Sequence, residues 1–254
     1  MRLRQEGANN YYVSNGRGFN GTALSREDVQ RVIDFAYDMC FGAGHHRVHR
    51  TGGQYGRRAG EKFCNTFQGK LGEVALYNFF TSNNIVCNQP DFRIMGEGVW
   101  DDSDLEIYGK KINVKSVASQ SNLLLLETDD WNAQGQYIPN LLLNNGSTVQ
   151  YDYFILVRLD PDIKRVFRAE KLMYSDAIEK AVIERLIFSK AWSYDIAGYT
   201  TTEYIIATIA NGYILPQNSI LNLYTTMDAR NYYVQSGDLG IIDNLLTQLR
   251  AIPQ

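Results

Sequence analysis

Residues 103–116 read SDLEIYGKKINVKS, and this stretch decides the fold. Apolar and polar residues alternate on both sides of a central Tyr-Gly pair, which is the pattern of two half-buried strands joined by a tight turn. Alternation places Asp104 on one face of the first strand, and Asn113 and Lys115 on one face of the second. Folding the hairpin about its glycine brings the carboxylate across from the amide and the ammonium group.

These three side chains are the minimum set for holding Mg²⁺ and a water molecule against a phosphodiester. Mg²⁺ prefers a few carboxylates together with water and phosphate oxygens. Asp104 is therefore the expected principal ligand, and Asn113 can add its amide oxygen. Lys115 would neutralise charge on the phosphate or help to deprotonate the attacking water. Burial beside a cation lowers the pKa of a lysine, as a general base requires.

The arrangement resembles the PD-(D/E)XK nuclease superfamily, which includes most type II restriction endonucleases. The resemblance covers about residues 66–160 and departs from the motif at two positions. Asn113 occupies the second acidic position, and Ser103 stands where the motif has Pro. The resemblance implies Mg²⁺ as the cofactor, with the backbone carbonyl of Val114 as a ligand beside Asp104.

A second segment supports the resemblance. Residues 69–80, GKLGEVALYNFF, are similar to the glycine-led helix that carries an additional active-site Glu in this superfamily. The similarity makes Glu73 a catalytic residue and metal ligand. The alternative is that Glu73 forms an ion pair, for example with Lys70 on the same helix.

Two other carboxylates compete for a place in the site. Asp91 follows Pro90 and is the literal PD alternative to Asp104, but its distance from Lys115 in sequence does not fit a simple hairpin. Glu106 shares a strand face with Asp104 and would supply the missing carboxylate, although a surface side chain is the simpler interpretation.

A basic segment precedes the helix. Residues 42–62 are rich in glycine and in cationic side chains, and we expect a loop that grips DNA phosphates. A solvated charged loop is the alternative. Gln120, shortly after Lys115, is a further candidate. The candidate DNA-binding residues are Arg47, Arg50, Arg57, Arg58, Lys62 and Gln120.

Histidines and cysteines suggest a different metal site. His45, His46 and His49 lie near Cys40 and would fit a histidine-centred metal hydrolase, but the second ligand pair of a structural zinc site is missing. The three cysteines are widely spaced without a CxxC pair, so we expect a reducing cytoplasm and no disulfide scaffold.

Composition sets broad limits. At 254 residues, with 44% hydrophobic and 21% charged residues, the chain can bury a full core. The formal net charge of −3 excludes a uniformly basic nucleic-acid binder but not a basic cleft. No apolar run approaches the length of a membrane span, so we expect a cytoplasmic protein with no membrane partner.

The expected fold is α/β: a restriction-endonuclease-like core with a mixed central β-sheet flanked by helices, and a C-terminal mainly helical elaboration. We expect one nuclease domain over 1–254, with an N-terminal arm and basic loop (1–65), a core (about 66–160) and the elaboration (161–254). Helices are predicted from Ser25 to about Gly42 and at 70–81, 169–190, 200–211 and 239–249, the last with Asp238 as its cap. Strands are predicted at 85–87, 103–108, 111–117, 153–157 and 163–168, the fourth being central; 123–126 fits either a helix or a strand.

The sequence therefore predicts a Mg²⁺-dependent DNA endonuclease, most simply a type II restriction enzyme that cuts double-stranded DNA as a homodimer. A repair, recombination or phage nuclease of the same fold is the nearest alternative. A DNA-binding protein that has lost the metal is another, and Asn113 is the best argument for it.

Overall fold

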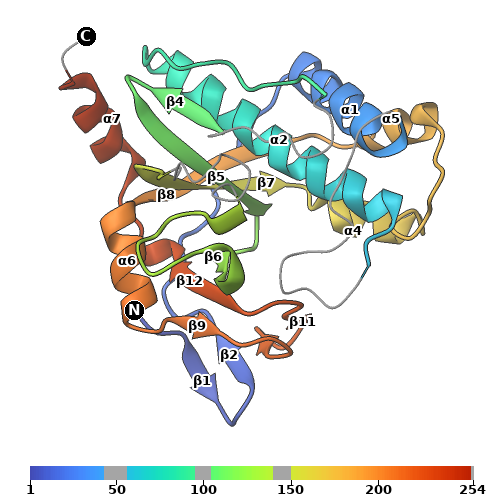
Figure 1. Cartoon of the computed structure of the whole chain (residues 1–254). Helices are drawn as coiled ribbons and strands as arrows, with labels where there is room; N and C mark the ends of the chain where they lie inside the picture. The colour runs from blue at the N-terminus through green and yellow to red at the C-terminus, as the bar shows by residue number, and fades with distance from the viewer. Residues whose placement is uncertain (43–55, 95–103, 140–149, 253–254) are drawn as a thin grey trace.

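A computed structural model describes residues 1–42, 56–94, 104–139 and 150–252. Its central element is a five-stranded sheet with the order β3-β8-β7-β5-β4 (Figure 1). β5 and β7 are parallel, and the other neighbouring pairs are antiparallel. The expected mixed α/β class is confirmed. The strands are β3 (Thr22–Ala23), β4 (Leu105–Ile107), β5 (Lys110–Ala118), β7 (Tyr153–Asp160) and β8 (Ser193–Thr201).

The predicted hairpin is present as β4 and β5. Leu105 pairs with Ile112 in the antiparallel register, and the chain reverses at Tyr108 and Gly109. Both turn residues have positive φ, 49° and 76°, as in the type I′ turns that suit the twist of a hairpin. The turn therefore fixes which residues of the two strands face each other.

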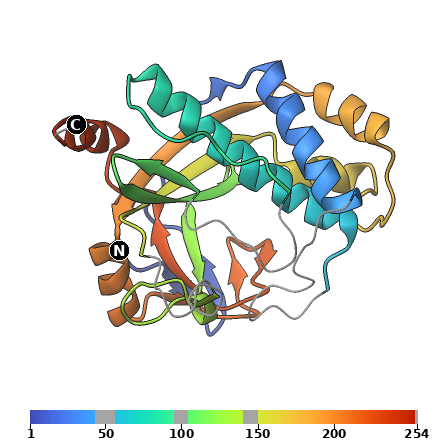
Figure 2. The ribbon, with the colours of Figure 1, turned by 45° about the horizontal axis from the view of Figure 1, so that its top comes forward.

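Helices cover one face of the central sheet (Figures 1 and 2). The largest core lies between them and the sheet face that carries Ile155 and Val157. α2 packs closely on β5, because Gly72 of the helix lies against the side chain of Ser116. The helices are α1 (Arg26–Phe41), α2 (Ala59–Ser82), α4 (Ile163–Ala169), α5 (Lys180–Phe188) and α7 (Ile242–Arg250).

Two smaller sheets lie below the other face. The first, with the order β6-β12-β9, packs with α6 under Phe154 and Leu156 of the central sheet. The second, with the order β1-β2-β10-β11, encloses a third core with the first. The elements are β6 (Leu123–Glu127), β9 (Ile214–Leu215), β12 (Asn231–Gln235), α6 (Thr202–Ala210), β1 (Arg4–Glu6), β2 (Asn10–Tyr12), β10 (Ile220–Leu221) and β11 (Thr225–Thr226).

Several predicted elements are confirmed. The side chain of Ser25 caps α1, and the helix predicted at 200–211 is present as α6, which Thr201 caps. β7 lies in the middle of the central sheet with its apolar side chains buried on both faces. The leucine run at 123–126 is a strand, β6, and not a helix.

Two expectations about the ends of the chain, and one about the basic loop, were wrong. The N-terminal arm is not separate from the rest of the fold, because β1 and β2 join β10 and β3 joins β8. The C-terminal part contains the predicted helices but is more than an elaboration of the core, because β8 belongs to the central sheet itself. The loop expected to extend to residue 62 ends earlier, since α2 already begins at Ala59.

Local predictions also need correction. Residues 85–87 form no strand and leave β4 at the sheet edge, where Asn88 N donates a single backbone bond to Glu106 O. Residues 163–169 form the helix α4 because Asp162 caps it, accepting from Lys164 N. Within the predicted 169–190 helix, Lys180–Phe188 form α5 and Ala169 ends α4, while the residues between them are not helical. Asp238 does not cap α7; its carboxylate binds the N-terminal ammonium group.

Candidate active site

The hairpin brings Asp104 and Asn113 together as the sequence predicts. Asp104 directly precedes β4, and extending the register of Leu105 with Ile112 by one pair places Asp104 opposite Asn113. The Asp104 Oδ2 accepts a hydrogen bond from the Val114 N–H at 2.6 Å. Because the N–H and C=O of one strand residue point to the same side, the Val114 carbonyl also faces this edge.

Asn113 is buried, with 7% of its surface exposed, and its Oδ1 accepts no hydrogen bond from the described residues. Burying an amide oxygen without a hydrogen-bond donor is unfavourable, and a donor or a cation beside the oxygen would remove this cost. This orphaned oxygen, on the strand face shared with Lys115, is the observation that best fits a bound cation at the hairpin.

Lys115 lies two residues further along the same face of β5. Burial lowers the pKa of its ammonium group, whereas the nearby carboxylates of Asp104, Asp130 and Glu127 favour the charged form. Its Nζ lies 5.8 Å from the centre of the Trp131 ring. Lys115 is thus a buried amine with acidic groups and an aromatic face near it.

Glu73 forms the ion pair with Lys70 that the sequence offered as the alternative to metal binding. Lys70 Nζ lies 2.5 Å from Glu73 Oε2, and both side chains are largely buried on α2. The helix packs on the face of β5 that carries Ser116, whereas Asn113 and Lys115 point to the opposite face. The role of Glu73 as a metal ligand therefore stays a prediction.

The literal PD residue lies near this ion pair. Asp91 is bound by Arg93 through its guanidinium group, at 2.6 Å between Nη2 and Oδ2. The hydrogen bond from Arg93, together with the more distant Lys70, holds the pKa of Asp91 below its usual range. Glu106 is exposed to solvent. Neither carboxylate has a described contact with Asn113 or Lys115.

The donors on the hairpin are all oxygens, as Mg²⁺ requires. They are the Asp104 carboxylate, the Asn113 amide and the Val114 carbonyl, so the set fits the ion but supplies a single carboxylate. Within the described ranges, no three Asp, Glu, His or Cys side chains come together in an arrangement that could hold a metal. The hairpin alone therefore offers a site for Mg²⁺ that is short of negative charge.

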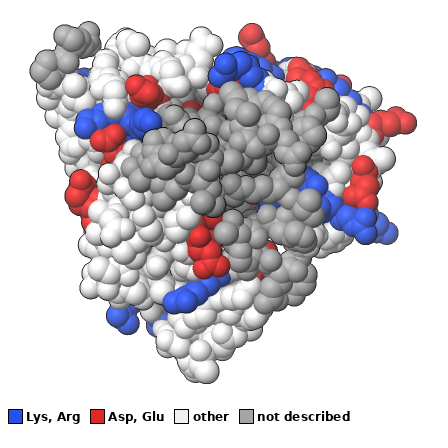
Figure 3. Space-filling view, in the orientation of Figure 1, with Lys and Arg blue, Asp and Glu red and all other residues white. Residues whose placement is uncertain are grey.

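Of the predicted DNA-binding residues, Arg47 and Arg50 lie outside the described residues, as do His45, His46 and His49. Arg58 forms an ion pair with Asp176 at 2.5 Å, although both side chains remain mostly exposed. Arg57 precedes α2, Lys62 lies in the first turn of α2, and Gln120 is exposed in the turn after β5. Among the described residues on the face shown in Figure 3, Lys and Arg side chains lie scattered together with Asp and Glu and form no continuous basic patch.

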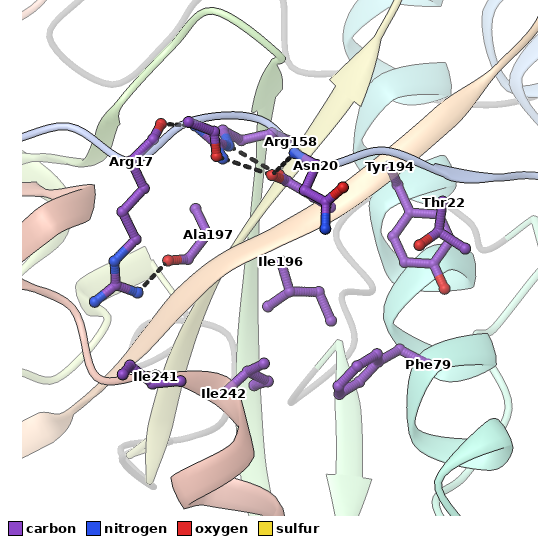
Figure 4. Close-up of a pocket in the computed structure, with 12 residues that line it drawn as sticks. Arg17, Asn20, Thr22, Phe79, Arg158, Tyr194, Ile196, Ala197, Ile241 and Ile242 are labelled. Carbon is purple, nitrogen blue, oxygen red and sulfur yellow. Dashed lines mark hydrogen bonds and ion pairs between the residues drawn. The ribbon is translucent and has the colours of Figure 1, made fainter.

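A pocket of about 460 Å³ lies away from the hairpin. It is lined by residues of the N-terminal segment, β7 and β8, with Phe79 of α2 and Ile242 of α7 (Figure 4). None of Asp104, Asn113 and Lys115 contributes to its walls. The pocket therefore does not coincide with the predicted active site.

A buried arginine fixes one wall of this pocket. Arg158 is 1% exposed, and its guanidinium group binds Asp195 through two hydrogen bonds of 2.8 and 2.5 Å. The same group donates to the backbone oxygens of Arg17 and Gly18, at 2.7 Å each, and to Asn122 Oδ1 at 2.9 Å. This network attaches the N-terminal segment to the central sheet and gives Arg158 a structural role.

The cysteines take no part in these sites. Cys40, Cys64 and Cys87 are free thiols. Burial raises the pKa of Cys40 and of Cys87 to about 11, so these thiols stay protonated near neutral pH.

No protein-family model, curated protein or solved structure matches this chain significantly. Within the described residues, no helix has the length and apolar character needed to cross a membrane.

The sequence interpretation missed the segment after β6. Glu127, Asp130 and Trp131 approach Lys115 from the second sheet layer. The signal was present in the sequence ETDDW at 127–131, where acidic residues follow an apolar strand. It could not be used without knowing that β6 packs beneath β5.

Proposed function

We propose that this protein is a Mg²⁺-dependent endonuclease that hydrolyses DNA phosphodiester bonds at the β4–β5 hairpin. The observation that carries the proposal is the buried, orphaned Oδ1 of Asn113, flanked by Asp104 in the hairpin register and by Lys115 on the same strand face. The parallel pairing of β5 with β7 supports it, since a strand bearing the catalytic lysine then lies inside a mixed sheet.

The residues of the hairpin would have two roles, metal binding and proton transfer. Asp104, the Asn113 amide and the Val114 carbonyl would hold Mg²⁺, which when bound supplies positive charge against the scissile phosphate and lowers the pKa of a bound water. Lys115 accepts the proton of the attacking water or donates a hydrogen bond to the phosphate. Its lowered pKa favours the first role near neutral pH more than an exposed lysine would.

The most specific form of the proposal is a type II restriction enzyme in the cytoplasm, acting as a homodimer on double-stranded DNA. Two-fold symmetry would let two hairpins cut both strands of a palindromic site. This part rests on analogy with the superfamily.

Incubation of unmethylated plasmid DNA with the protein and Mg²⁺ tests the proposal. We expect discrete fragments, with no products when EDTA replaces Mg²⁺. A smear, or a preference for nicked or linear ends, would assign the protein to a repair, recombination or phage nuclease of the same fold. The absence of cleavage on any unmethylated DNA would reject the nuclease function.

A DNA-binding protein without catalysis is the second candidate, and Asn113 in the second acidic position favours it. It predicts DNA binding that is unchanged by EDTA and by Asp104→Asn. A gel-shift titration on the same plasmid fragments distinguishes the two candidates.

A further inference from the structure

Lys115 is approached by an acidic group that lies outside the hairpin. Asp130 ends the short 3₁₀ helix η1 (Thr128–Asp130), which follows β6 in the second sheet layer. It is half-buried, and one of its carboxylate oxygens is fully enclosed. Its charge acts on Lys115 together with that of Asp104.

The residue after Asp130 holds this turn in place. Trp131 is 4% exposed, and its ring lies 5.2 Å from that of Phe154 on β7, between ring centres. It also packs against Tyr137 and Tyr151, at 5.2 and 6.0 Å. Since Lys115 Nζ lies over the same ring, Trp131 fixes the end of η1 beside the catalytic face of β5.

Asn113 gives an independent indication that this space receives a ligand. Its side chain is more than nine-tenths buried, lies on the same face as Lys115, and presents an Oδ1 that accepts no hydrogen bond. A cation between the hairpin and η1 would interact favourably with this oxygen. It would also need a second carboxylate, which the hairpin does not supply.

The other carboxylates considered for this place fit less well. Glu106 is exposed on the edge strand, and Glu73 is bound to Lys70 on the helix that covers the opposite face of β5. Glu127 ends β6 and lies four residues before Trp131, whereas Asp130 directly precedes this ring, over which Lys115 Nζ lies. Asp130 is the best placed.

We propose that Asp130 supplies the carboxylate that Asn113 cannot, so that a divalent cation is held between the hairpin and the turn after β6. Asp104 and Asn113 contribute from one side and Asp130 from the other. This inference rests on the proposed function for the identity of the site, but it concerns cation binding and is measurable without DNA.

The test is a titration of the full chain with Mn²⁺. Electron paramagnetic resonance measures binding as the loss of the free-ion signal. We expect Asp130→Asn to weaken Mn²⁺ binding by at least about 10-fold, as loss of a supporting carboxylate does in metal sites. The matched control is Asp129→Asn, because Asp129 is the adjacent, exposed carboxylate; it should bind as the wild type does. Circular dichroism melting identifies variants that remain folded, and Asp130→Ser serves if Asp130→Asn is unstable.

Moving the carboxylate from position 130 to position 113 makes the test specific. Asn113→Asp introduced into Asp130→Asn returns a carboxylate to the site, and we expect it to recover most of the lost affinity. Unchanged Mn²⁺ binding in both Asp130 variants would overturn the inference, as would a loss confined to Glu127→Gln.

Cleavage assays keep the two proposals apart. If the wild type cuts DNA and the Asp130 variants both cut and bind Mn²⁺ normally, the inference fails and the proposed function stands. If Mn²⁺ binding depends on Asp130 but the wild type cuts no DNA, the proposed function fails and the cation site stands. If the wild type neither binds Mn²⁺ nor cuts DNA, both fail.

Discussion

Replacing Lys115 by Met should lower the rate of DNA cleavage by about 10²–10⁴-fold, the usual contribution of a positioned general acid or base. Methionine keeps the length and apolar body of the side chain but removes the amine that lies over Trp131. The change removes a desolvated charge but also the positive charge near three carboxylates, so circular dichroism is used to check that the variant is folded. Single-turnover cleavage of a DNA fragment measures the effect.

The pH dependence of the same rate tests the role of the amine. A general base must be deprotonated, and burial holds the pKa of Lys115 below its ordinary 10.5. The wild-type rate should therefore rise as pH increases toward that lowered pKa and then level off, whereas Lys115→Met should lose this rise. Lys111→Met, on the same strand, is the control and should retain cleavage within a few-fold. Equal rates for Lys115→Met and the wild type would exclude Lys115 from the chemistry.

Replacing Arg158 by Leu should lower the free energy of unfolding by about 3–5 kcal/mol, because it leaves the Asp195 carboxylate largely buried without its partner. It also removes the donors that hold the backbone of Arg17 and Gly18. Urea unfolding followed by tryptophan fluorescence measures the change. Arg165→Leu, on the exposed side of α4, is the matched control and should shift stability by less than about 0.5 kcal/mol.

A double substitution separates the ion pair from the packing. Arg158→Leu with Asp195→Leu removes both charges, and it should be more stable than Arg158→Leu alone. A loss below about 1 kcal/mol for Arg158→Leu would show that the N-terminal segment is held by other contacts.

Local sequence patterns were sufficient for the hairpin. Period-two alternation and the Tyr108-Gly109 turn set the register that places Asp104 opposite Asn113. The central position of β7 followed from its continuous apolar run, and the cap Ser25 followed from side-chain chemistry. Each of these depends on residues within one or two turns of the chain.

Long-range pairing was not accessible in the same way. β3 joins β8 across more than 160 positions of sequence, and the alternation in a two-residue strand is too short to indicate a partner. The approach of Asp130 depends on Trp131 packing under Phe154, which is a contact between two sheet layers. For Glu73 the sequence left two outcomes open, and the ion pair with Lys70 is present.

The most direct test of the hairpin as the active site compares Asp104→Asn with Asp91→Asn on unmethylated plasmid DNA in Mg²⁺. Asp91 is the literal PD residue but is bound to Arg93, so it serves as the matched carboxylate. We predict that Asp104→Asn produces no fragments, while Asp91→Asn gives the wild-type fragment pattern. Cleavage that persists in Asp104→Asn and disappears in Asp91→Asn would contradict the assignment of the active site to the hairpin.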